Sequence, residues 1–220
     1  MLDYPGQVAC TVFTCGCNFR CPFCHNPALV VGRDDSLTHS FADVLAFLES
    51  RHRQLDAICL TGGEPLLHEE SLLLMQAAKA MGYRVKLDTN GSKPDLLRQA
   101  VADGSVDYVA MDIKNSPEKY AVTSGVDMLD AVRASVAFLQ EGHVRCEFRT
   151  TVTGCLHEAA DFAAIGQWLA GAERYFLQGF KDSGDILGGD PAPFAVSDEQ
   201  LEEFLAVVRA FIPSAEIRGR

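Results

Sequence analysis

The sequence lacks long apolar runs and has few positive charges. No stretch approaches the roughly 20 consecutive apolar residues that a membrane-spanning helix needs. The opening residues, MLDYPGQVACTVF, also lack the basic segment and the long apolar segment of a secretory signal. The 30 acidic residues outnumber the 19 basic ones, and the resulting net charge of −11 argues against a general nucleic-acid-binding protein. We therefore expect a cytoplasmic protein that acts on neither membranes nor nucleic acids.

Internal repeats, low-complexity segments and an obvious interdomain linker are lacking as well. A length of 220 residues fits one domain, and a hydrophobic share of 48% is enough for a substantial core. These observations predict a single domain over residues 1–220.

The cysteines, in contrast, are numerous and unevenly placed. Four of the eight lie within residues 15–24, where Cys17, Cys21 and Cys24 have the spacing C-x3-C-x2-C. In a reducing compartment, clustered cysteines bind metal or perform redox chemistry more often than they form disulfides. Three thiolates could hold three corners of an iron–sulfur cluster and leave one iron open to a small molecule. A zinc site with His25 as the fourth ligand is disfavoured, because a ligand adjacent to Cys24 would strain a tetrahedron.

Short apolar runs alternate with amphipathic ones along the chain. Strands are predicted at residues 8–13, 57–61, 84–89, 106–113, 144–152 and 174–180. Helices are predicted at residues 40–52, 69–82, 94–104, 127–142, 158–171 and 197–212. Such strand–helix units predict an α/β fold with parallel strands. Right-handed crossovers would curl six units into a partial (β/α)6 TIM-like barrel, while a doubly wound open sheet is the alternative.

Chemically distinctive residues follow the predicted strands. The cysteine loop follows the first strand, GGEP (62–65) the second and DTNG (88–91) the third, while DIK (112–114) ends the fourth and Arg149 lies within the fifth. The carboxyl ends of parallel strands meet at one rim of a barrel. We therefore expect all these groups to face one site.

These motifs, in this order, resemble the radical S-adenosylmethionine (SAM) superfamily, and the likeness covers essentially the whole chain as one radical SAM core domain. DYPG, GCNFRCPFCHNP, TGGEP, DTNG and DIK look most like the glycyl-radical-enzyme activases, above all the activating proteins of anaerobic ribonucleoside-triphosphate reductase. The resemblance implies an oxidoreductase in which a [4Fe–4S] cluster cleaves SAM reductively to a 5′-deoxyadenosyl radical. That radical would abstract hydrogen from a glycine of a partner glycyl radical enzyme, expected to be anaerobic ribonucleotide reductase. Flavodoxin or ferredoxin would supply the electron.

The resemblance also implies roles for individual residues. The [4Fe–4S] ligands would be Cys17, Cys21 and Cys24. The residues at SAM would be Phe23 beside the adenine, Gly62 and Gly63 near the methionyl amino group, and Glu64, Asp88, Lys114 and Arg149. A monovalent-cation site beside SAM would use Asp88, Thr89, Asp112 and a backbone carbonyl near Met111.

Other interpretations stay open for several of these features. Asp88 could cap a helix, Asp112 and Lys114 could form a local ion pair, and Arg149 could form a buried salt bridge. Cys15 could be a bystander or a competitor during cluster assembly. The end of the last predicted strand, LQGFKDSG, lacks the histidine that lies near SAM in pyruvate formate-lyase activase, so the resemblance assigns no adenosyl contact there.

Two further hypotheses concern the loop at 181–194 and the reaction itself. The loop is long enough to be a flap that gates a partner peptide. The alternative functions are a radical SAM enzyme that acts on a small molecule and a non-enzymatic iron–sulfur or zinc scaffold.

Overall fold

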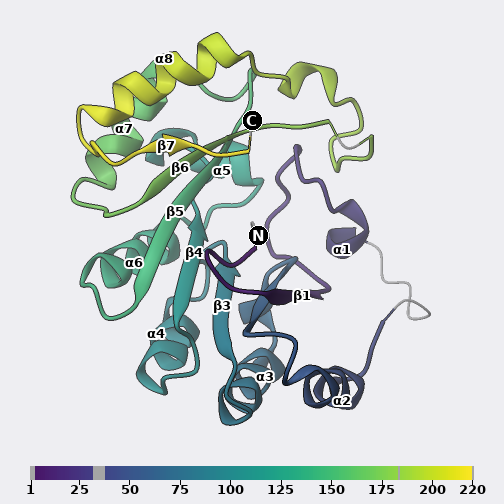
Figure 1. Cartoon of the computed structure of the whole chain (residues 1–220). Coiled ribbons are helices and arrows are strands. Elements are labelled where there is room, and N and C mark those ends of the chain that lie inside the picture. Colours follow the sequence, from purple (N-terminus) through teal and green to yellow (C-terminus); the bar gives the residue numbers. More distant parts are fainter. Residues whose placement is uncertain (1–2, 32–37, 183, 220) are drawn as a thin grey trace.

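The computed structural model describes residues 3–31, 38–182 and 184–219. Within them, seven parallel strands form one curved sheet (Figure 1): β1 (Ala9–Thr14), β2 (Ala57–Gly62), β3 (Arg84–Thr89), β4 (Tyr108–Asp112), β5 (Arg145–Val152), β6 (Tyr175–Gly179) and β7 (Glu216–Ile217). The strands stand in the sheet in their chain order, from β1 to β7. A doubly wound sheet reverses its strand order, so this sequential order is that of a barrel wall. The prediction of a partial parallel barrel is confirmed.

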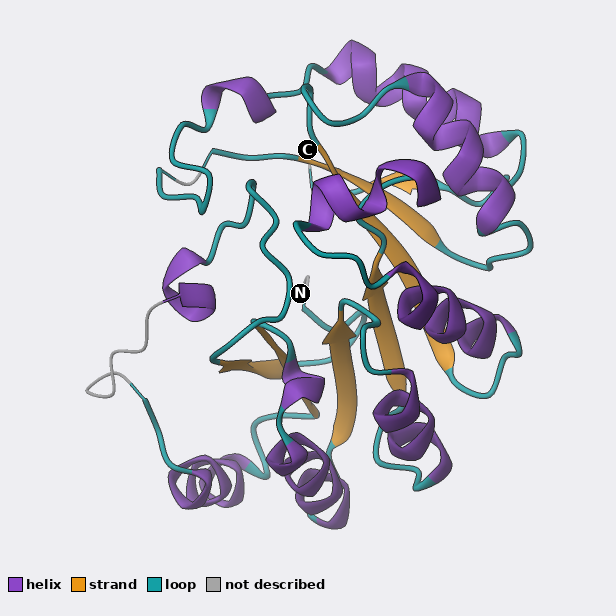
Figure 2. Cartoon of the chain, turned by 180° about the vertical axis from the view of Figure 1, so that it is seen from behind, coloured by secondary structure: helices purple, strands orange, loops and turns teal. Residues whose placement is uncertain are grey.

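The helices between the strands cover the outer, convex side of the sheet (Figure 2). The predicted helices are present as α2 (Phe41–Arg51), α3 (Glu69–Ala80), α4 (Pro94–Ala102), α6 (Leu129–Gln140), α7 (Ala159–Trp168) and α8 (Asp198–Arg209). The sequence analysis missed α1 (Pro27–Val31), α5 (Tyr120–Ser124) and β7. These elements have five, five and two residues, which is too short to show a hydrophobic period.

Local sequence signals set several helix ends. Ser40 begins α2 in a capping box, in which its hydroxyl accepts a hydrogen bond from the Asp43 N–H and the Asp43 carboxylate accepts one from the Ser40 N–H. Pro94 occupies the first turn of α4, where its missing N–H costs nothing. Gly82 follows the end of α3 with a φ of 89°, a conformation that glycine adopts without strain.

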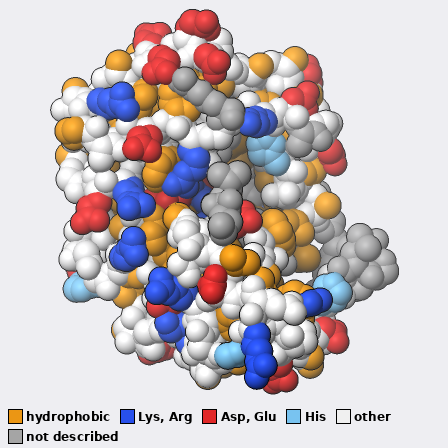
Figure 3. Space-filling view, viewed as in Figure 1, with side chains coloured by type: hydrophobic (Ala, Val, Ile, Leu, Met, Phe, Trp, Pro, Cys, Tyr) orange, Lys and Arg blue, Asp and Glu red, His pale blue; other side chains and the backbone are white. Residues whose placement is uncertain are grey.

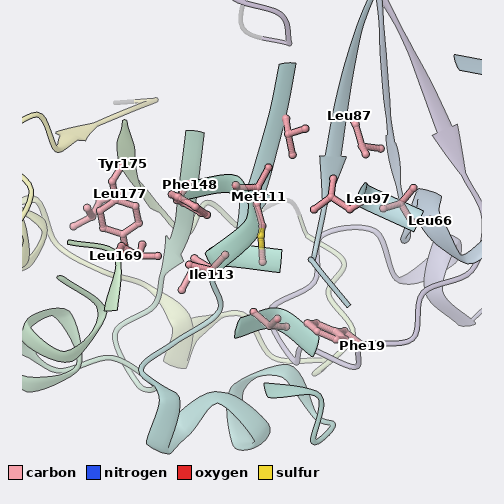
Figure 4. Packing of buried hydrophobic residues seen from close by; sticks show 14 of the residues in the cluster. Phe19, Leu66, Leu87, Leu97, Met111, Ile113, Phe148, Leu169, Tyr175 and Leu177 are labelled. Carbon is pink, nitrogen blue, oxygen red and sulfur yellow. The ribbon is translucent and has the colours of Figure 1, made fainter. Parts of the chain in front are cut away.

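The hydrophobic core lies between the sheet and its helices. Alternation along the strands sends Leu60, Leu87 and Leu177 toward this layer, and each is fully buried. Figure 4 shows Met111, Ile113 and Phe148 close together in the same layer; Met111 and Phe148 are neighbours in the β4–β5 register. The apolar face of the sheet is therefore its convex face.

The concave face of the sheet carries charge instead. The side chains two residues apart on one strand share a face, and the ion pairs identify that face: Lys86 with Asp88, Asp88 with Arg149, and Arg149 with Asp112. Barrel interiors are usually filled by branched apolar side chains. A charged interior is stable only where its charges are paired and hydrogen-bonded.

Deeper on this face, Glu147 is fully buried and joins β5 to the last strand. Its carboxylate accepts hydrogen bonds from Arg218 at 2.6 and 2.9 Å and from the Tyr108 hydroxyl at 2.7 Å. Arg218 follows β7, so this contact attaches the end of the described chain to the barrel wall.

The surface charge is distributed unevenly. On the face shown in Figure 3, Lys and Arg side chains gather in one band, although the net charge of the chain is −11. Among the described helices, none has the length and apolar character needed to cross a membrane.

Replacing Arg218 with Met is expected to lower the free energy of unfolding by about 3 kcal/mol, because the buried Glu147 carboxylate would lose its cationic partner. We place the value at the low end for buried pairs because the Arg218 side chain is 20% exposed. Urea unfolding measures the change. The matched control is Arg133→Met at an exposed position of α6, expected to cost less than about 1 kcal/mol; equal losses in the two variants would contradict the role of the Glu147 contact.

Candidate functional site

A pocket opens at the carboxyl ends of the strands, and most of the predicted site residues line it. They are Cys17, Cys21, Phe23, Cys24, Gly62, Gly63, Glu64, Asp88, Thr89, Asp112 and Lys114. Two predicted residues do not line it: Arg149 lies behind the two aspartates, and the Met111 side chain is buried in the core. The tertiary structure thus gathers motifs that are far apart in the sequence.

The GGEP turn holds the start of the cysteine loop through backbone contacts. The Gly63 N–H donates to the Thr14 carbonyl at 2.9 Å, and the Glu64 N–H donates to the Gly16 carbonyl at 2.8 Å. A Cβ atom on Gly63 would lie 1.9 Å from the Gly16 carbonyl oxygen. Gly62 has a φ of 120°, which side chains rarely permit. Both glycines are therefore required for the end of β2 to approach the end of β1.

Glu64 joins this turn to the end of β3. Its side chain is fully buried, and its carboxylate accepts hydrogen bonds from the Leu66 N–H at 3.1 Å, the Thr89 hydroxyl at 2.8 Å and the Asn90 N–H at 2.7 Å. Burial raises the pKa of Glu64 to about 7, against the opposing effect of its donors. The carboxylate thus shapes the turn and connects GGEP with DTNG.

Asn18 and Asn90 attach the cysteine loop to DTNG, a role that the sequence analysis missed. The Asn90 side-chain amide donates to Asn18 Oδ1 at 3.0 Å, and the Asn18 amide donates to Ser92 Oγ at 2.8 Å. The Asn90 amide also lies 3.9 Å from the Cys17 sulfur. Asn90 lies within the DTNG motif, and this position could have identified it as a residue of the site.

The other side of the cysteine loop is held by α5 and by the loop at 181–194. The Arg20 N–H donates to the Ser124 carbonyl at 2.7 Å. The Leu187 N–H donates to the Cys24 carbonyl at 3.2 Å, and the Gly188 N–H donates to the Pro22 carbonyl at 2.7 Å. The loop at 181–194, apart from residue 183, which lies outside the described part of the chain, therefore supports the cysteine loop; its gating of a peptide stays a prediction.

The three thiols line one pocket but do not form a preformed ligand set. In the described ranges, no three His, Cys, Asp or Glu side chains stand in the arrangement of a metal-ion site. Burial raises the pKa of Cys21 to about 11 and also raises that of Cys17. Thiols of this kind bind metal as thiolates and release their protons to solvent when they do so. Three soft sulfur donors on one loop, next to the open pocket, fit an iron–sulfur cluster.

Aromatic rings form the wall of the site next to the cysteines. The Phe23 ring centre lies 6.3 Å from that of Phe194, which in turn lies 5.8 Å from that of Phe180. His25 stacks on Phe180 with ring centres 4.9 Å apart. The histidine that directly follows Cys24 therefore packs against the end of β6.

The two aspartates at the rim are held by cations from the chain. Asp112 accepts hydrogen bonds from Arg149 Nε at 2.9 Å and Lys114 Nζ at 3.2 Å. Burial would raise the pKa of Asp112, but Arg149 and Lys114 outweigh it and lower the pKa to about 2. Burial acts to lower the pKa of Lys114, and Asp112 outweighs it and raises that pKa. Asp88 is paired with Lys86 and Arg149 and caps no helix.

His157 positions the backbone of Lys114 from behind the site. Its Nε2 lies 3.0 Å from the Lys114 carbonyl, and its Nδ1 accepts from the Thr153 N–H at 3.1 Å. A carbonyl accepts hydrogen bonds and an N–H donates them, so the ring is neutral with its proton on Nε2. Burial lowers the pKa of His157, in agreement with this state.

Comparison with known proteins identifies the family of the chain. The profile of the Radical SAM superfamily matches residues 11–153. A protein of Methanocaldococcus jannaschii, provisionally named as a glycyl-radical enzyme activating enzyme, is 28% identical over 99% of this chain and 91% of its own. The 7-carboxy-7-deazaguanine synthase of Geobacter sulfurreducens is 30% identical over 93% of this chain and 87% of its own.

Solved structures show the same fold in a larger protein. SuiB of Streptococcus suis, in structures bound to S-adenosylmethionine and to the precursor peptide SuiA, matches with TM-scores of 0.74 and 0.76 at 12% and 13% identity. The match covers 96% of this chain and 50% and 49% of the SuiB chains. At this identity the likeness concerns the fold alone.

Replacing Glu64 with Gln is expected to destabilise the protein by about 1–3 kcal/mol, because the new amide N–H₂ would face the Asn90 N–H or the Thr89 hydroxyl donor. For a domain of this size, that loss lowers the melting temperature by roughly 2–4 °C per kcal/mol. Thermal unfolding measures it. The control is Glu69→Gln, which changes an exposed carboxylate five residues after Glu64. If Glu64→Gln melted at the same temperature as the control, the hydrogen bonds of Glu64 would not stabilise the site.

His157 is expected to lower the stability of the folded protein as the pH decreases below the ordinary histidine pKa of 6.5, while the raised pKa of Glu64 acts in the opposite direction over part of the same range. The pKa of His157 is lower in the folded than in the unfolded state, so the unfolded state binds more protons in this range. One such group contributes at most about 1.4 kcal/mol per pH unit. Urea unfolding from pH 7.5 to about pH 5 should show a smaller loss of stability on acidification in His157→Gln than in the wild type. His143→Gln, whose ring is exposed, should change with pH as the wild type does. Identical slopes in all three proteins would exclude this role of His157.

Proposed function

Because the chain belongs to the radical SAM superfamily, we propose that it is a glycyl-radical-enzyme activase, which removes a hydrogen atom from one glycine of a partner protein. The observation that carries the proposal is the pocket in which three cysteines meet the GGEP and DTNG turns and the Lys114 ammonium. The chain is thus an enzyme of a family that uses a [4Fe–4S] cluster and SAM.

The cysteines would hold the cluster on three of its irons, and the fourth iron would bind SAM. When bound, the cluster would supply the electron for reductive cleavage of SAM, the chemistry that removes a hydrogen atom from the substrate. The remaining task of the chain is to bind and orient the two cofactors and to exclude water.

Individual side chains support SAM binding in different ways. The Lys114 ammonium lines the pocket with its side chain 15% exposed, so it can pair with the SAM carboxylate. The Phe23 ring lies beside the cysteines and offers an apolar face to the adenine. Glu64 already accepts three hydrogen bonds from the chain, so we assign it to shaping the turn and not to the SAM ammonium.

We propose anaerobic ribonucleoside-triphosphate reductase as the partner, and flavodoxin or ferredoxin as the electron donor. The support is the likeness of the motifs, together with the relative from M. jannaschii that aligns over nearly all of both chains.

A second candidate is a radical SAM enzyme that acts on a small molecule. The specific observation in its favour is the 30% identity to a 7-carboxy-7-deazaguanine synthase over 93% of this chain. The two functions differ in where the radical finally resides: on a partner polypeptide in one case and on a small product in the other.

The decisive experiment is anaerobic reconstitution with iron and sulfide, reduction with dithionite, and electron paramagnetic resonance with and without SAM. We expect a reduced [4Fe–4S] signal that changes when SAM is added, together with formation of 5′-deoxyadenosine. Adding the reductase should then produce a glycyl radical doublet. A SAM response without any doublet on candidate partners would favour the small-molecule enzyme, and a cluster indifferent to SAM would leave only a scaffold.

Cys21→Ala is expected to abolish SAM cleavage and leave the barrel folded, because the cluster would lose one of its three protein ligands while the apolar core stays intact. Formation of 5′-deoxyadenosine and the melting temperature measure the two effects. Cys15→Ala is the matched control: Cys15 lies in the same loop but does not line the pocket, so its loss should preserve cleavage. If the reconstituted Cys21→Ala variant cleaved SAM as well as the wild type, the assignment of Cys21 as a cluster ligand would be wrong.

A further inference from the structure

A buried lysine lies directly beneath the rim of the site. The Lys86 side chain on β3 is 2% exposed, and its ammonium contacts Asp88 two residues further along the same strand. The same nitrogen lies 3.8 Å from the sulfur of Cys59 on the neighbouring strand β2. Lys86 does not line the pocket, whereas Asp88 does. An ammonium is buried in this way only where a carboxylate compensates its charge.

All four oxygens of the two rim carboxylates are engaged by cationic donors of the chain. In Asp88, Oδ1 contacts Lys86 and Oδ2 contacts Arg149 at 3.2 Å. In Asp112, Oδ1 contacts Arg149 at 2.9 Å and Oδ2 contacts Lys114 at 3.2 Å. Three cationic side chains therefore surround two carboxylates.

The third side-chain oxygen expected at a monovalent-cation site is engaged as well. The Thr89 hydroxyl donates to Glu64 and accepts from the Gly91 N–H at 3.1 Å. The sequence analysis assigned the side-chain oxygens of Asp88, Thr89 and Asp112 to a monovalent cation. Because each of these oxygens already has a partner within the chain, they do not fit a free cation. A further positive charge would also face three cationic side chains at close range.

We propose that the Lys86 ammonium replaces the monovalent cation of this site as a covalently attached positive charge. It holds Asp88, and Asp88 together with Asp112 holds the Arg149 guanidinium behind the pocket. Since Lys86 reaches the pocket only through Asp88, it is a positioning residue. The consequence is that SAM binding does not depend on potassium or sodium; this part of the inference rests on the proposed function.

The test compares the wild type with Lys86→Ala in potassium, ammonium and choline chlorides at equal ionic strength. The substitution removes the ammonium of Lys86 and leaves space for a small ion. The first readout is the melting temperature of the full chain without cluster or SAM. The wild type should melt at the same temperature in all three salts, and Lys86→Ala should melt higher in potassium or ammonium than in choline, whose ion is too large to enter.

The second readout is SAM affinity of the reconstituted protein. The wild type should bind SAM equally in the three salts. Lys86→Ala should bind about tenfold more weakly in choline, the effect of losing one charge-assisted hydrogen bond, and should recover in potassium or ammonium. Lys86→Met, which retains volume but not charge, should be weakened without recovery. It also serves as the second variant if Lys86→Ala does not fold.

Lys79→Ala is the matched control, because Lys79 forms an ion pair with Asp107 away from the pocket and its loss should produce no salt-specific response. Potassium-dependent melting or SAM binding of the wild type would overturn the proposal, as would a Lys86→Ala variant indifferent to the choice of salt. If the reconstituted wild type binds SAM in none of the salts, the proposed function fails, and the melting series alone decides the role of Lys86.

Discussion

The carboxylate of Glu64 is the contact on which the geometry of the site depends. It is buried at the end of β2, yet its three hydrogen bonds reach both its own turn and the end of β3. The backbone of the same turn holds the residues that precede the cysteines. The side chain of Glu64 therefore sets the relative positions of GGEP and DTNG, and the backbone of the same residue adds the cysteine loop. A buried carboxylate with unmet acceptors would be costly, so the need to satisfy it holds the two turns together.

The two faces of the sheet have different roles. The convex face carries the apolar side chains that pack against the helices and stabilise the barrel wall. The concave face carries two groups of paired charges: Glu147 with Arg218 in the interior, and Asp88 and Asp112 with their cationic partners at the rim. Since a buried charge is tolerated only with a partner, each charge on the concave face restricts its neighbour. This restriction orients the groups that face the pocket.

Much of the fold and part of the site could be predicted from the sequence. The strand at Arg84–Thr89 has the predicted ends, and the Ser40 cap and Gly82 are where local signals place them. The predicted motifs meet in one pocket because strand ends gather at one rim. The roles of Asn18, Lys86 and His157 were not predicted, since a lone asparagine, lysine or histidine has no local pattern that reveals its partner. The short elements α1, α5 and β7 were not predicted for a similar reason, because each has too few residues to show a hydrophobic periodicity.

The sequence by itself determined the alternation of strands and helices, the spacing of the three cysteines and the placement of the polar motifs after the strands. These features depend on residues within a few positions of one another. The tertiary structure alone decided the sequential strand order, the partners of Glu64, and the pairing of Asp88 with Lys86 and Arg149. The contact of Glu64 with Thr89 joins residues 25 positions apart, and that of Arg149 with Asp88 joins residues 61 positions apart. Such pairs exist only after the sheet has curled, because the curvature brings the strand ends and their charges within reach.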